Sequence, residues 1–531
     1  MSGIPPQRPP LWQNLWFQLA LVLVVAGCIY WPLLGSSGFA FSEGQRVFPG
    51  WTFADRGDWL MPHLLDQPYL RKPPGMPWAI AAFALLFGES EYSARAVSAL
   101  AMTLGGVLAF AFARRWFGGA WGLVAGIAFL LTPLYWYPGR SAEIESLHNV
   151  FVQLAMLVTL EVLLNRPNAR AAIGLTFALA AGLAGMVIVK GPAGIPCVIA
   201  AALAACVVKR SPRVLLSPTL TASIALAGLT IAYLAWRIAQ RVAELPEPPV
   251  LQGAEQFLWK PGRRLEVLLL PASALLAALP WSGALIIALT KTTEPNSPHL
   301  QRGRAASLTV LLALAIYTVL GVYNNRYTMP ATTLLPLVVA FAGWRVVNSP
   351  LPAWAARLAT HTLMRRPWIW AAALFMAALV SLVYTEHRRD IRTSGRDAGR
   401  RLGDFLPHGS TLTGDLLLDH RPEVAWYARQ HAATLGKTLT VQWRPAHKHA
   451  QGENPIPPPG TYLALLNIPV EIDQPAELDR YKAAGLMDRL ERVHLDAAHK
   501  FLFEVFIVRP EPDRLVDAAL TATPGLPPAI P

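Results

Sequence analysis

Charge is scarce in this chain of 531 residues, since only 15% of them are Asp, Glu, Lys or Arg, while 53% are apolar. With a mean hydropathy of +0.36 and long apolar runs, this composition excludes an ordinary soluble enzyme and predicts a membrane protein. Cysteine is scarcer still. Cys28, Cys197 and Cys206 each lie inside an apolar run, so a framework of disulfides is not expected.

Several nucleotide and hydrolase motifs are also lacking. The chain has no glycine-rich phosphate loop, HExxH or GxSxG in a suitable context, so no nucleotide-binding module is expected. A net charge of +13 could indicate a nucleic-acid partner, but the lysines and arginines cluster at the ends of apolar runs. Orientation of membrane helices is the simpler explanation, and no nucleic acid is predicted as a partner.

The apolar runs predict a polytopic α-helical membrane protein, because a span needs roughly 20 mostly apolar residues. The first run is expected to stay in the mature protein, since no small-residue cleavage pattern follows it. A twelfth run, 77–88, is too short to span and is expected at the membrane interface. The eleven predicted spans lie near residues 12–34, 93–113, 120–138, 145–164, 171–189, 193–208, 217–239, 265–290, 305–321, 329–347 and 367–385.

Alternate loops differ in charge, which predicts the orientation. One set is short, basic and almost free of acids, which marks it as cytoplasmic. The other set holds nearly all the acidic loop residues and comprises 35–91, 139–144, 240–264, 322–328 and everything after 386. We therefore predict a multi-pass protein of the bacterial inner membrane with a cytoplasmic N-terminus and a periplasmic C-terminal region.

Residues 1–386 are predicted to form the transmembrane domain and 387–531 a soluble periplasmic α/β domain. The stretches "TLTGDLLLD", "TLTVQW", "TYLALLN" and "KFLFEVFIV" are typical of short strands. "EVAWYARQHAATLG" and "ELDRYKAAGLMDRLERV" are typical of amphipathic helices.

The unusual polar residues all fall in the outer segments. Cations there run against the positive-inside trend, and carboxylates beside them could act on a bound hydroxyl. The candidates are Glu43, Asp55, Asp58, Trp59, Tyr69, Arg71 and Lys72 in the first outer loop (35–91), Arg140, Glu143, Glu145 and His148 in the second, and Lys190, Arg326 and Tyr327 further on.

Most candidates also have a purely structural interpretation. Arg71 and Lys72 are equally consistent with a pair at the membrane interface whose charged ends snorkel toward water. Glu145 is equally consistent with a residue that caps a helix. Asp55 and Asp58 are better explained by turn structure. Two alternating histidines in "RPAHKHA" lack the ligand count of a metal site. No metal ligand or cofactor is predicted, and participation of a divalent metal stays open.

Together the outer residues suggest transfer chemistry on a lipid phosphate. Cations would hold a phosphate, a carboxylate would take the proton of an attacking hydroxyl, and aromatic faces would contact a sugar or lipid.

Several motifs, in this order along residues 15 to 347, carry a resemblance. The first loop has Ser42-Glu43, then Gly57-Asp58-Trp59, Pro62, and Tyr69-Leu70-Arg71-Lys72-Pro73-Pro74. "FGESEYSARAVSAL" (87–100), "GRSAEIE" (139–145), "KGPAG" (190–194), "LPW" (279–281) and "NRYTMP" (325–330) follow. The set resembles the bacterial aminoarabinose-transferase-like and protein O-mannosyltransferase-like membrane glycosyltransferases of the GT-C fold.

This resemblance implies a glycosyltransferase that moves one sugar from a polyprenyl-phosphate carrier, such as undecaprenyl phosphate, to a glycolipid (lipid A or lipopolysaccharide-like) or glycan acceptor. It implies that Lys72, helped by Lys190 and Arg326, holds the departing phosphate, and that Glu43 or Glu145 activates the acceptor hydroxyl. Arg140, Tyr327, Trp59 and Tyr69 are further predicted substrate contacts. Two alternatives are transfer to protein Ser or Thr, and a non-catalytic relative that binds or transports the lipid.

The chain departs from the family pattern at the position usually given a catalytic role. Ser42 stands where the family has its first-loop Asp, Gln45 where an Arg is common, and Glu145 where the second loop has Asp. A serine cannot be the general base near neutral pH without an adjacent base, so a glutamate has to take over.

Overall fold

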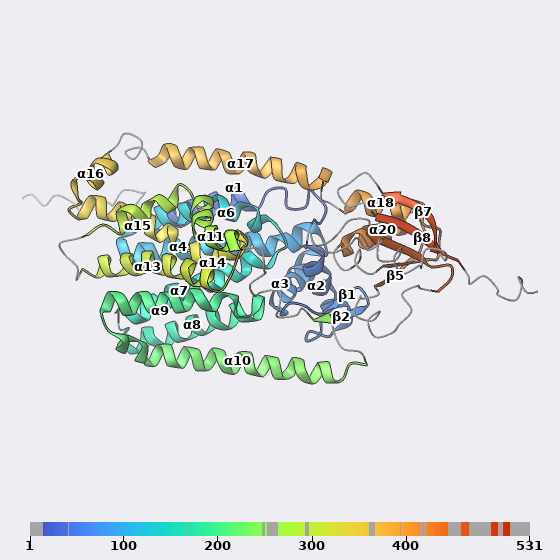
Figure 1. The fold of residues 1–531 in the computed structure, drawn as a ribbon, viewed down its shortest axis with the longest axis horizontal. Helices are drawn as coiled ribbons and strands as arrows, with labels where there is room; N and C mark the ends of the chain where they lie inside the picture. The colour runs from blue at the N-terminus through green and yellow to red at the C-terminus, as the bar shows by residue number, and fades with distance from the viewer. Residues whose placement is uncertain are drawn as a thin grey trace, which may run out of the picture. The chain divides into compact units, whose positions relative to one another are not determined.

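The computed structural model describes residues 14–40, 42–165, 167–246, 250–251, 264–291, 297–360, 367–392, 395–414, 418, 421–443, 458–466, 490–496 and 503–509. The chain divides into two compact units, residues 1–390 and 391–531. The first unit is a helical bundle, and the second contains a mixed sheet with helices (Figure 1).

Helices of the first unit follow the apolar runs. They are α1 (Leu15–Tyr30), α2 (Gly44–Arg56), α3 (Gly75–Phe87), α4 (Glu91–Phe117), α5 (Gly119–Leu130), α6 (Pro133–Trp136), α7 (Ile144–Asn165), α8 (Ala169–Lys190), α9 (Ile195–Lys209), α10 (Pro218–Ala243), α11 (Arg264–Ala277), α12 (Ala284–Ala288), α13 (Pro298–Val319), α14 (Met329–Thr332), α15 (Leu335–Asn348), α16 (Ala353–Thr360) and α17 (Pro367–Arg392). Short 3₁₀ turns join some of them, namely η2 (Pro138–Arg140), η3 (Gly191–Gly194), η4 (Pro212–Leu216), η6 (Trp281–Gly283) and η7 (Asn325–Thr328).

The span count differs from the predicted eleven. Among the described residues, six helical stretches are long and apolar enough to cross a membrane, or eight if each of two bent helix pairs is one span. The pairs bend by 61° after α5 and by 102° after α11, where Pro133 and Pro280 lie. α1 and the apolar part of α17 are shorter than a full span. The chain is thus a multi-pass membrane protein, but the count of eleven is not confirmed.

One of the six stretches, Ala169–Lys209, is a helical hairpin. It consists of α8 and α9 joined by η3, and Ala171 near its start and Lys209 at its end line the same cavity. A continuous helix would place these residues roughly 57 Å apart at 1.5 Å per residue, so the chain must reverse at η3. Lys190 therefore lies at one end of the bundle, and Lys209 at the other.

Helix ends in the bundle follow local sequence signals. Ser90 accepts a hydrogen bond from Ser93 N while the Ser93 side chain accepts from Ser90 N, which begins α4 with a capping box. Gly118, with φ of 104°, ends the same helix in a conformation that favours glycine.

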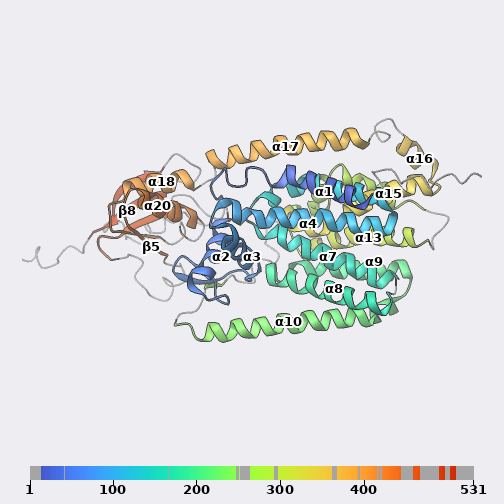
Figure 2. The same cartoon turned by 180° about the vertical axis from the view of Figure 1, so that it is seen from behind.

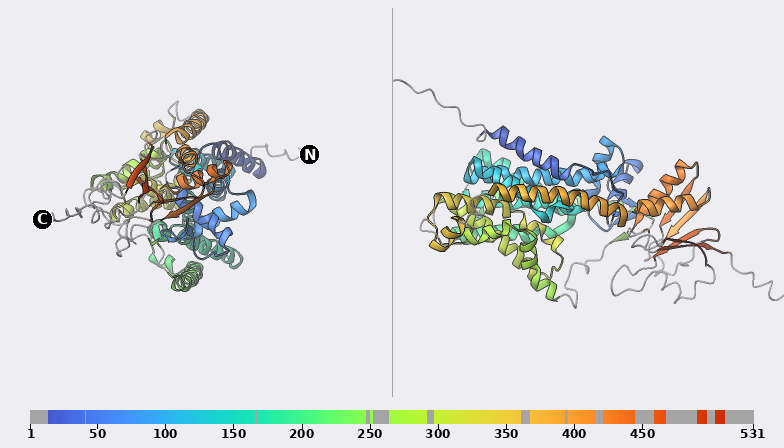
Figure 3. Two further views of the ribbon diagram at one scale, coloured as in Figure 1. Left: turned by 90° about the vertical axis from the view of Figure 1, so that its right-hand side faces the viewer. Right: turned by 90° about the horizontal axis from the view of Figure 1, so that it is seen from above.

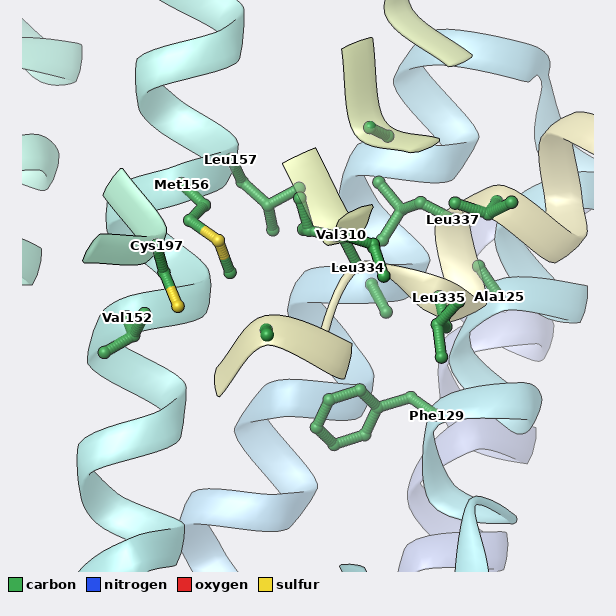
Figure 4. Packing of buried hydrophobic residues seen from close by; sticks show 14 of the residues in the cluster. Ala125, Phe129, Val152, Met156, Leu157, Cys197, Val310, Leu334, Leu335 and Leu337 are labelled. Carbon is green, nitrogen blue, oxygen red and sulfur yellow. The ribbon is translucent and has the colours of Figure 1, made fainter. Parts of the chain in front are cut away.

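Close packing of small and aliphatic residues fills the bundle. A Cβ atom at Gly182 of α8 would lie 2.9 Å from Ala155 N of α7, so glycine permits this close approach. In Figure 4, Met156 and Leu157 of α7, Cys197 of α9 and Val310 of α13 lie in one buried cluster. Within the first unit, α10 and α17 lie at opposite edges of the bundle in the two views of Figures 1 and 2. The right-hand view of Figure 3 shows the long helices running side by side.

The first outer loop folds as a compact element against the bundle. α2 packs on α3, and α3 contacts α4 and α8. Between α2 and α3, strands β1 (His63–Leu64) and β2 (Gln67–Leu70) pair antiparallel, and β3 (Val250–Leu251) joins β2 in parallel. The predicted short run 77–88 falls in α3.

The second unit contains a five-stranded sheet in the order β5-β4-β6-β8-β7. β4 lies parallel to both β5 and β6, whereas β8 is antiparallel to β6 and β7. Its strands are β4 (Ser410–Gly414), β5 (Leu439–Trp443), β6 (Tyr462–Leu466), β7 (Leu490–Asp496) and β8 (Phe503–Val508), and its helices are α18 (Arg396–Phe405) and α20 (Pro422–Thr434).

The four predicted strands and the first predicted helix of this region are confirmed by β4, β5, β6, β8 and α20. The second predicted helix is wrong at its end, because residues 490–493 belong to strand β7, which pairs with β8. Most of the rest of that prediction, and both histidines of "RPAHKHA", lie outside the described residues.

Candidate active site

Glu145, at the start of α7, is the centre of a cluster of charges. Its side chain is buried, and its Oε1 accepts hydrogen bonds from Lys190 Nζ at 3.1 Å and from Arg326 Nε at 2.8 Å. Lys190 ends α8 and Arg326 belongs to η7, so three distant segments meet here. Oε2 of Glu145 is buried and has no hydrogen-bond partner within the described part of the chain.

Glu143 lies two residues earlier and shares the same arginine. Its Oε2 accepts from Arg326 Nη2 at 2.7 Å, and its Oε1 accepts from the Ser42 hydroxyl at 2.8 Å. Burial raises the pKa of Glu143, although the positive charge of Arg326 opposes that shift. Arg326 thus bridges two buried carboxylates.

Further cations surround these acids. Burial lowers the pKa of Lys72 to about 7, and the positive charges of Arg46 and Lys190 act in the same direction. Nε and Nη1 of the buried Arg46 find no hydrogen-bond acceptor among the described residues. Arg46, Lys72, Lys190 and Arg326 therefore face two carboxylates, an excess of positive charge suited to an anion. We name these six residues the outer cluster: Arg46, Lys72, Glu143, Glu145, Lys190 and Arg326.

Glu43 occupies a different environment. Arg95 of α4 donates to both of its carboxylate oxygens at 2.8 Å, and the backbone N–H groups of Ala142 and Ala40 donate at 2.8 and 2.9 Å. The same guanidinium also donates to the carbonyls of residues 34, 37 and 38. A carboxylate accepts about four hydrogen bonds, so that of Glu43 is saturated. This pair ties the first outer loop to α4 and to the second loop.

The predicted aromatic contacts fall into two groups. The ring of Tyr327 lies 4.4 Å from the ammonium of Lys190 and is 37% exposed, so it borders the outer cluster. Trp59 is 40% exposed and stacks on Phe53 at 5.7 Å. Tyr69, in contrast, is only 3% exposed, with the guanidinium of Arg71 5.8 Å from its ring centre.

Arg140, a predicted substrate contact, is held by partners in α1 and α17. It is buried and donates to the carbonyls of Ile29 and Tyr30 at the end of α1, and to Glu386 of α17 at 3.0 Å. Ser37 donates to the other oxygen of Glu386 at 2.6 Å. Arg140, in η2, therefore joins α1 and α17.

The predicted turn is confirmed at Asp58 but is wrong for Asp55, which lies within α2. The carboxylate of Asp58 accepts from the backbone N–H groups of Leu60 and Met61 and from Arg241 Nε of α10 at 2.7 Å. Partial burial would raise its pKa, but the hydrogen bonds from Arg241 and the backbone lower the pKa overall. Asp58 thus closes a turn and anchors it to α10.

Across the part of the chain that the structure describes, no group of three or more His, Cys, Asp or Glu side chains gathers as a metal site would require.

Comparison with known proteins identifies a matching family profile and similar sequences. The sequence profile of the family described as dolichyl-phosphate-mannose-protein mannosyltransferase matches residues 71–236. The undecaprenyl phosphate-α-4-amino-4-deoxy-L-arabinose arabinosyl transferase of Pseudomonas aeruginosa (strain LESB58) is 25% identical over 384 residues, covering 70% of this chain and 66% of that protein. Its counterpart from Edwardsiella ictaluri is 28% identical over 142 residues, which is 27% of this chain and 25% of that protein. The matched regions thus span a quarter to just under two thirds of these relatives' lengths.

A solved structure decides the fold. The crystal structure of ArnT from Cupriavidus metallidurans bound to undecaprenyl phosphate aligns with a TM-score of 0.65, covering 93% of this chain and 98% of that chain, at 17% identity. The chain has the ArnT fold. The predicted resemblance and the predicted GT-C fold class are confirmed.

Within this ArnT fold, two members of the outer cluster, and Ser42 beside them, carried signals that sequence reasoning did not use fully. Glu143 was noted beside Glu145 but given no role, although Glu143 directly precedes α7 and Glu145 lies in its first turn. Arg46 was passed over because Gln45 stands at the position compared with the family arginine. Arg46 lies three residues after Glu43, and this spacing at the start of a helix could have indicated it. Ser42 was treated only as a loss, whereas it donates to Glu143.

Proposed function

We propose that this protein is a membrane glycosyltransferase that moves a single sugar from a polyprenyl-phosphate donor to a glycolipid, such as a lipid A-like molecule, or to a glycan. The observation that carries this proposal is the outer cluster, where Arg326 bridges two buried carboxylates beside Lys72 and Lys190. The ArnT fold and the arabinosyl transferase names of its relatives support it.

The cations would hold the donor's phosphate. Lys72, Lys190 and Arg46 provide charges that a phosphate can share, and Arg326 adds a planar guanidinium suited to paired oxygens. Each charge-assisted hydrogen bond to a phosphate is worth about 1.5–3 kcal/mol. As the bond from sugar to phosphate breaks, the phosphate oxygen keeps the electron pair, and these cations stabilise its developing charge.

Glu145 would take the proton of the acceptor hydroxyl. That hydroxyl oxygen attacks the anomeric carbon, the bond to phosphate breaks, and the proton passes to the open Oε2 of Glu145. A phosphate that draws Lys190 and Arg326 toward itself would leave this carboxylate a better proton acceptor. Glu43, the other predicted base, would instead position the first loop, because its acceptor sites are filled.

The exposed aromatic rings would contact the sugar or lipid. Tyr327 and Trp59 each keep more than a third of their surface accessible, so their faces could pack on a sugar ring or polyprenyl unit. Tyr69 would act indirectly, by supporting the strand that precedes Lys72.

The proposed setting is the bacterial inner membrane. The outer cluster would face the periplasm, with the N-terminus cytoplasmic and residues 387–531 periplasmic, because the basic loops lie at the opposite end of the bundle. Transfer to protein is a second candidate, supported by the mannosyltransferase profile over residues 71–236.

The test compares envelope glycolipids and glycoproteins, by mass spectrometry, in cells with the gene, without it, and with a plasmid-borne E145Q form at matched protein level. Sugar-modified glycolipid that disappears on deletion and returns only with the wild-type gene supports the proposal. Loss of sugar from protein alone would assign the protein acceptor instead. Identical profiles in all three strains would overturn transferase function and favour a protein that only binds or transports the lipid.

A further inference from the structure

A charged cavity lies at the opposite end of the helical bundle from the outer cluster. It has a volume of about 500 Å³ and is bordered by the end of α4, the end of α7, the start of α8, the end of α9 and the start of α13. Glu145 and the cavity residue Glu161 both belong to α7 and are 16 residues apart, which corresponds to about 24 Å along a helix. The cavity is therefore separate from the proposed active site.

Among the described residues that line it, three are cations, Arg115, Lys209 and Arg302, and one is a carboxylate, Glu161. Arg115 pairs with Glu161 Oε1 at 2.8 Å, and the other oxygen accepts from Trp116 and Asn165 at 2.8 Å. The carboxylate thus accepts hydrogen bonds from one cation and two neutral donors, and Lys209 and Arg302 are the further cations among the described lining residues.

Neutral amides hold the remaining two cations at the cavity. Lys209 Nζ donates to Gln301 Oε1 at 2.8 Å, and Arg302 donates from two nitrogens to Asn165 Oδ1 at 2.9 and 3.1 Å. These contacts fix the positions of the two cations at the cavity.

Two long helices also begin here. Asn168 accepts from Ala171 N as the N-cap of α8, and α13 begins at Pro298. The backbone N–H groups at these two N-termini therefore lie at the cavity, while the C-termini of α4, α7 and α9 border it as well.

We propose that this cavity binds a phosphate group, and that the anionic headgroup of a phospholipid in the adjacent leaflet is its source. A volume of about 500 Å³ is within the range of small-ligand sites, and basic pockets between helix ends are suited to lipid phosphates. The positive-inside trend accounts for exposed cations such as Arg210 and Arg213, which follow α9. It does not require cations held by amides around a cavity.

The test titrates purified full-length protein in detergent with short-chain phosphatidylglycerol, with phosphatidylcholine as the uncharged comparison, and counts bound lipid by native mass spectrometry. K209Q/R302Q removes two cavity cations, and R210Q/R213Q removes two exposed cations from the same end of the bundle. We expect phosphatidylglycerol affinity to fall at least about tenfold in K209Q/R302Q and less than about threefold in R210Q/R213Q. K209R/R302K keeps both charges and should bind as the wild type does, even if the glutamine variant proves unstable.

Inorganic phosphate serves as the competing probe. If phosphate displaces phosphatidylglycerol only at concentrations far above that of the lipid, the lipid headgroup is the ligand. If phosphate displaces it at concentrations similar to that of the lipid, the cavity is a phosphate site whose ligand is a soluble phosphate. Equal losses in K209Q/R302Q and R210Q/R213Q would show that general surface charge attracts the lipid, and would overturn the proposal. Unchanged binding in both would overturn it as well.

Discussion

The Ser42 hydroxyl donates a 2.8 Å hydrogen bond to Oε1 of Glu143, which lies 101 residues further along the chain. Position 42 is the one at which the family resemblance implies an aspartate. Here a neutral donor faces a carboxylate supplied by the second outer segment, and Arg326 holds the other oxygen of that carboxylate. A carboxylate, that of Glu143, therefore lies against position 42 although the first loop supplies none there.

Replacing Ser42 by aspartate should reduce transfer. S42D would place a second carboxylate against buried Glu143, and like charges at such short range are unfavourable in a partly dehydrated site. We expect the transfer rate to fall at least about tenfold, whereas S42A, which removes one hydrogen bond of about 1.5–3 kcal/mol to a charged group, should retain a folded protein with a milder defect. The measurement is transfer by purified variants; S42D activity equal to or above that of wild type would contradict this account.

Donor binding should depend on pH through Lys72. Because burial and neighbouring cations lower the pKa of Lys72 to about 7, its amine is charged below that pH and neutral above it. A sugar phosphodiester keeps its single negative charge, so its affinity should fall as pH rises above about 7, by up to tenfold per unit.

K72R is the matched control, since an arginine stays charged throughout this range. Its donor affinity, measured by titration with a fluorescent polyprenyl phosphodiester between pH 6 and 9, should change little. A wild-type affinity that is flat over this range, or a K72R slope equal to that of wild type, would show that Lys72 does not hold the phosphate.

Breaking the Glu43–Arg95 ion pair should lower the stability of the protein more than its rate of sugar transfer. Both side chains are fully buried, and removing one partner of such a pair typically costs about 3–5 kcal/mol because the other charge is left uncompensated. E43Q should therefore lower the midpoint of thermal unfolding of the purified protein, and the double variant E43Q/R95Q should recover part of the loss. A normal unfolding midpoint together with a large loss of transfer would instead make Glu43 the base.

Arg140 and Glu386 should behave as a structural pair. R140Q removes the positive charge that pairs with the buried carboxylate of Glu386, so the midpoint of thermal unfolding should fall. The donor affinity of the folded fraction should stay within about threefold of wild type. A donor affinity reduced tenfold or more at an unchanged unfolding midpoint would instead show that Arg140 contacts the substrate.

Apolar runs and misplaced cations were sufficient to predict much of this arrangement. Each predicted span contains a helix, and Lys190 and Arg326, identified because they oppose the positive-inside trend, meet at Glu145. The number of crossings was not predictable, because prolines bend two of the runs and α1 ends after 16 residues.

Pairings between residues that lie far apart in the chain could also not be predicted from the sequence. Glu43 and Glu145 look equivalent as outer acids, yet Glu43 is saturated by Arg95, 52 residues away, while Glu145 keeps an open oxygen. Arg140 looked available for substrate because its partner Glu386 follows 246 residues later. Such differences depend on which side chains meet in the fold, and no local pattern encodes that.

The central claim is that Glu145 is the base, and single-turnover transfer by E145Q tests it most directly. The substitution keeps the size of the side chain but removes its capacity to take a proton, and loss of general-base help typically costs about 10²–10⁴ in rate. The assay uses purified protein preloaded with a polyprenyl-phosphate sugar that the wild type accepts, and donor affinity is measured on the same sample. We predict a rate reduced by at least about 100-fold, with donor affinity within about tenfold of wild type. An E145Q protein that transfers sugar at the wild-type rate would contradict the account.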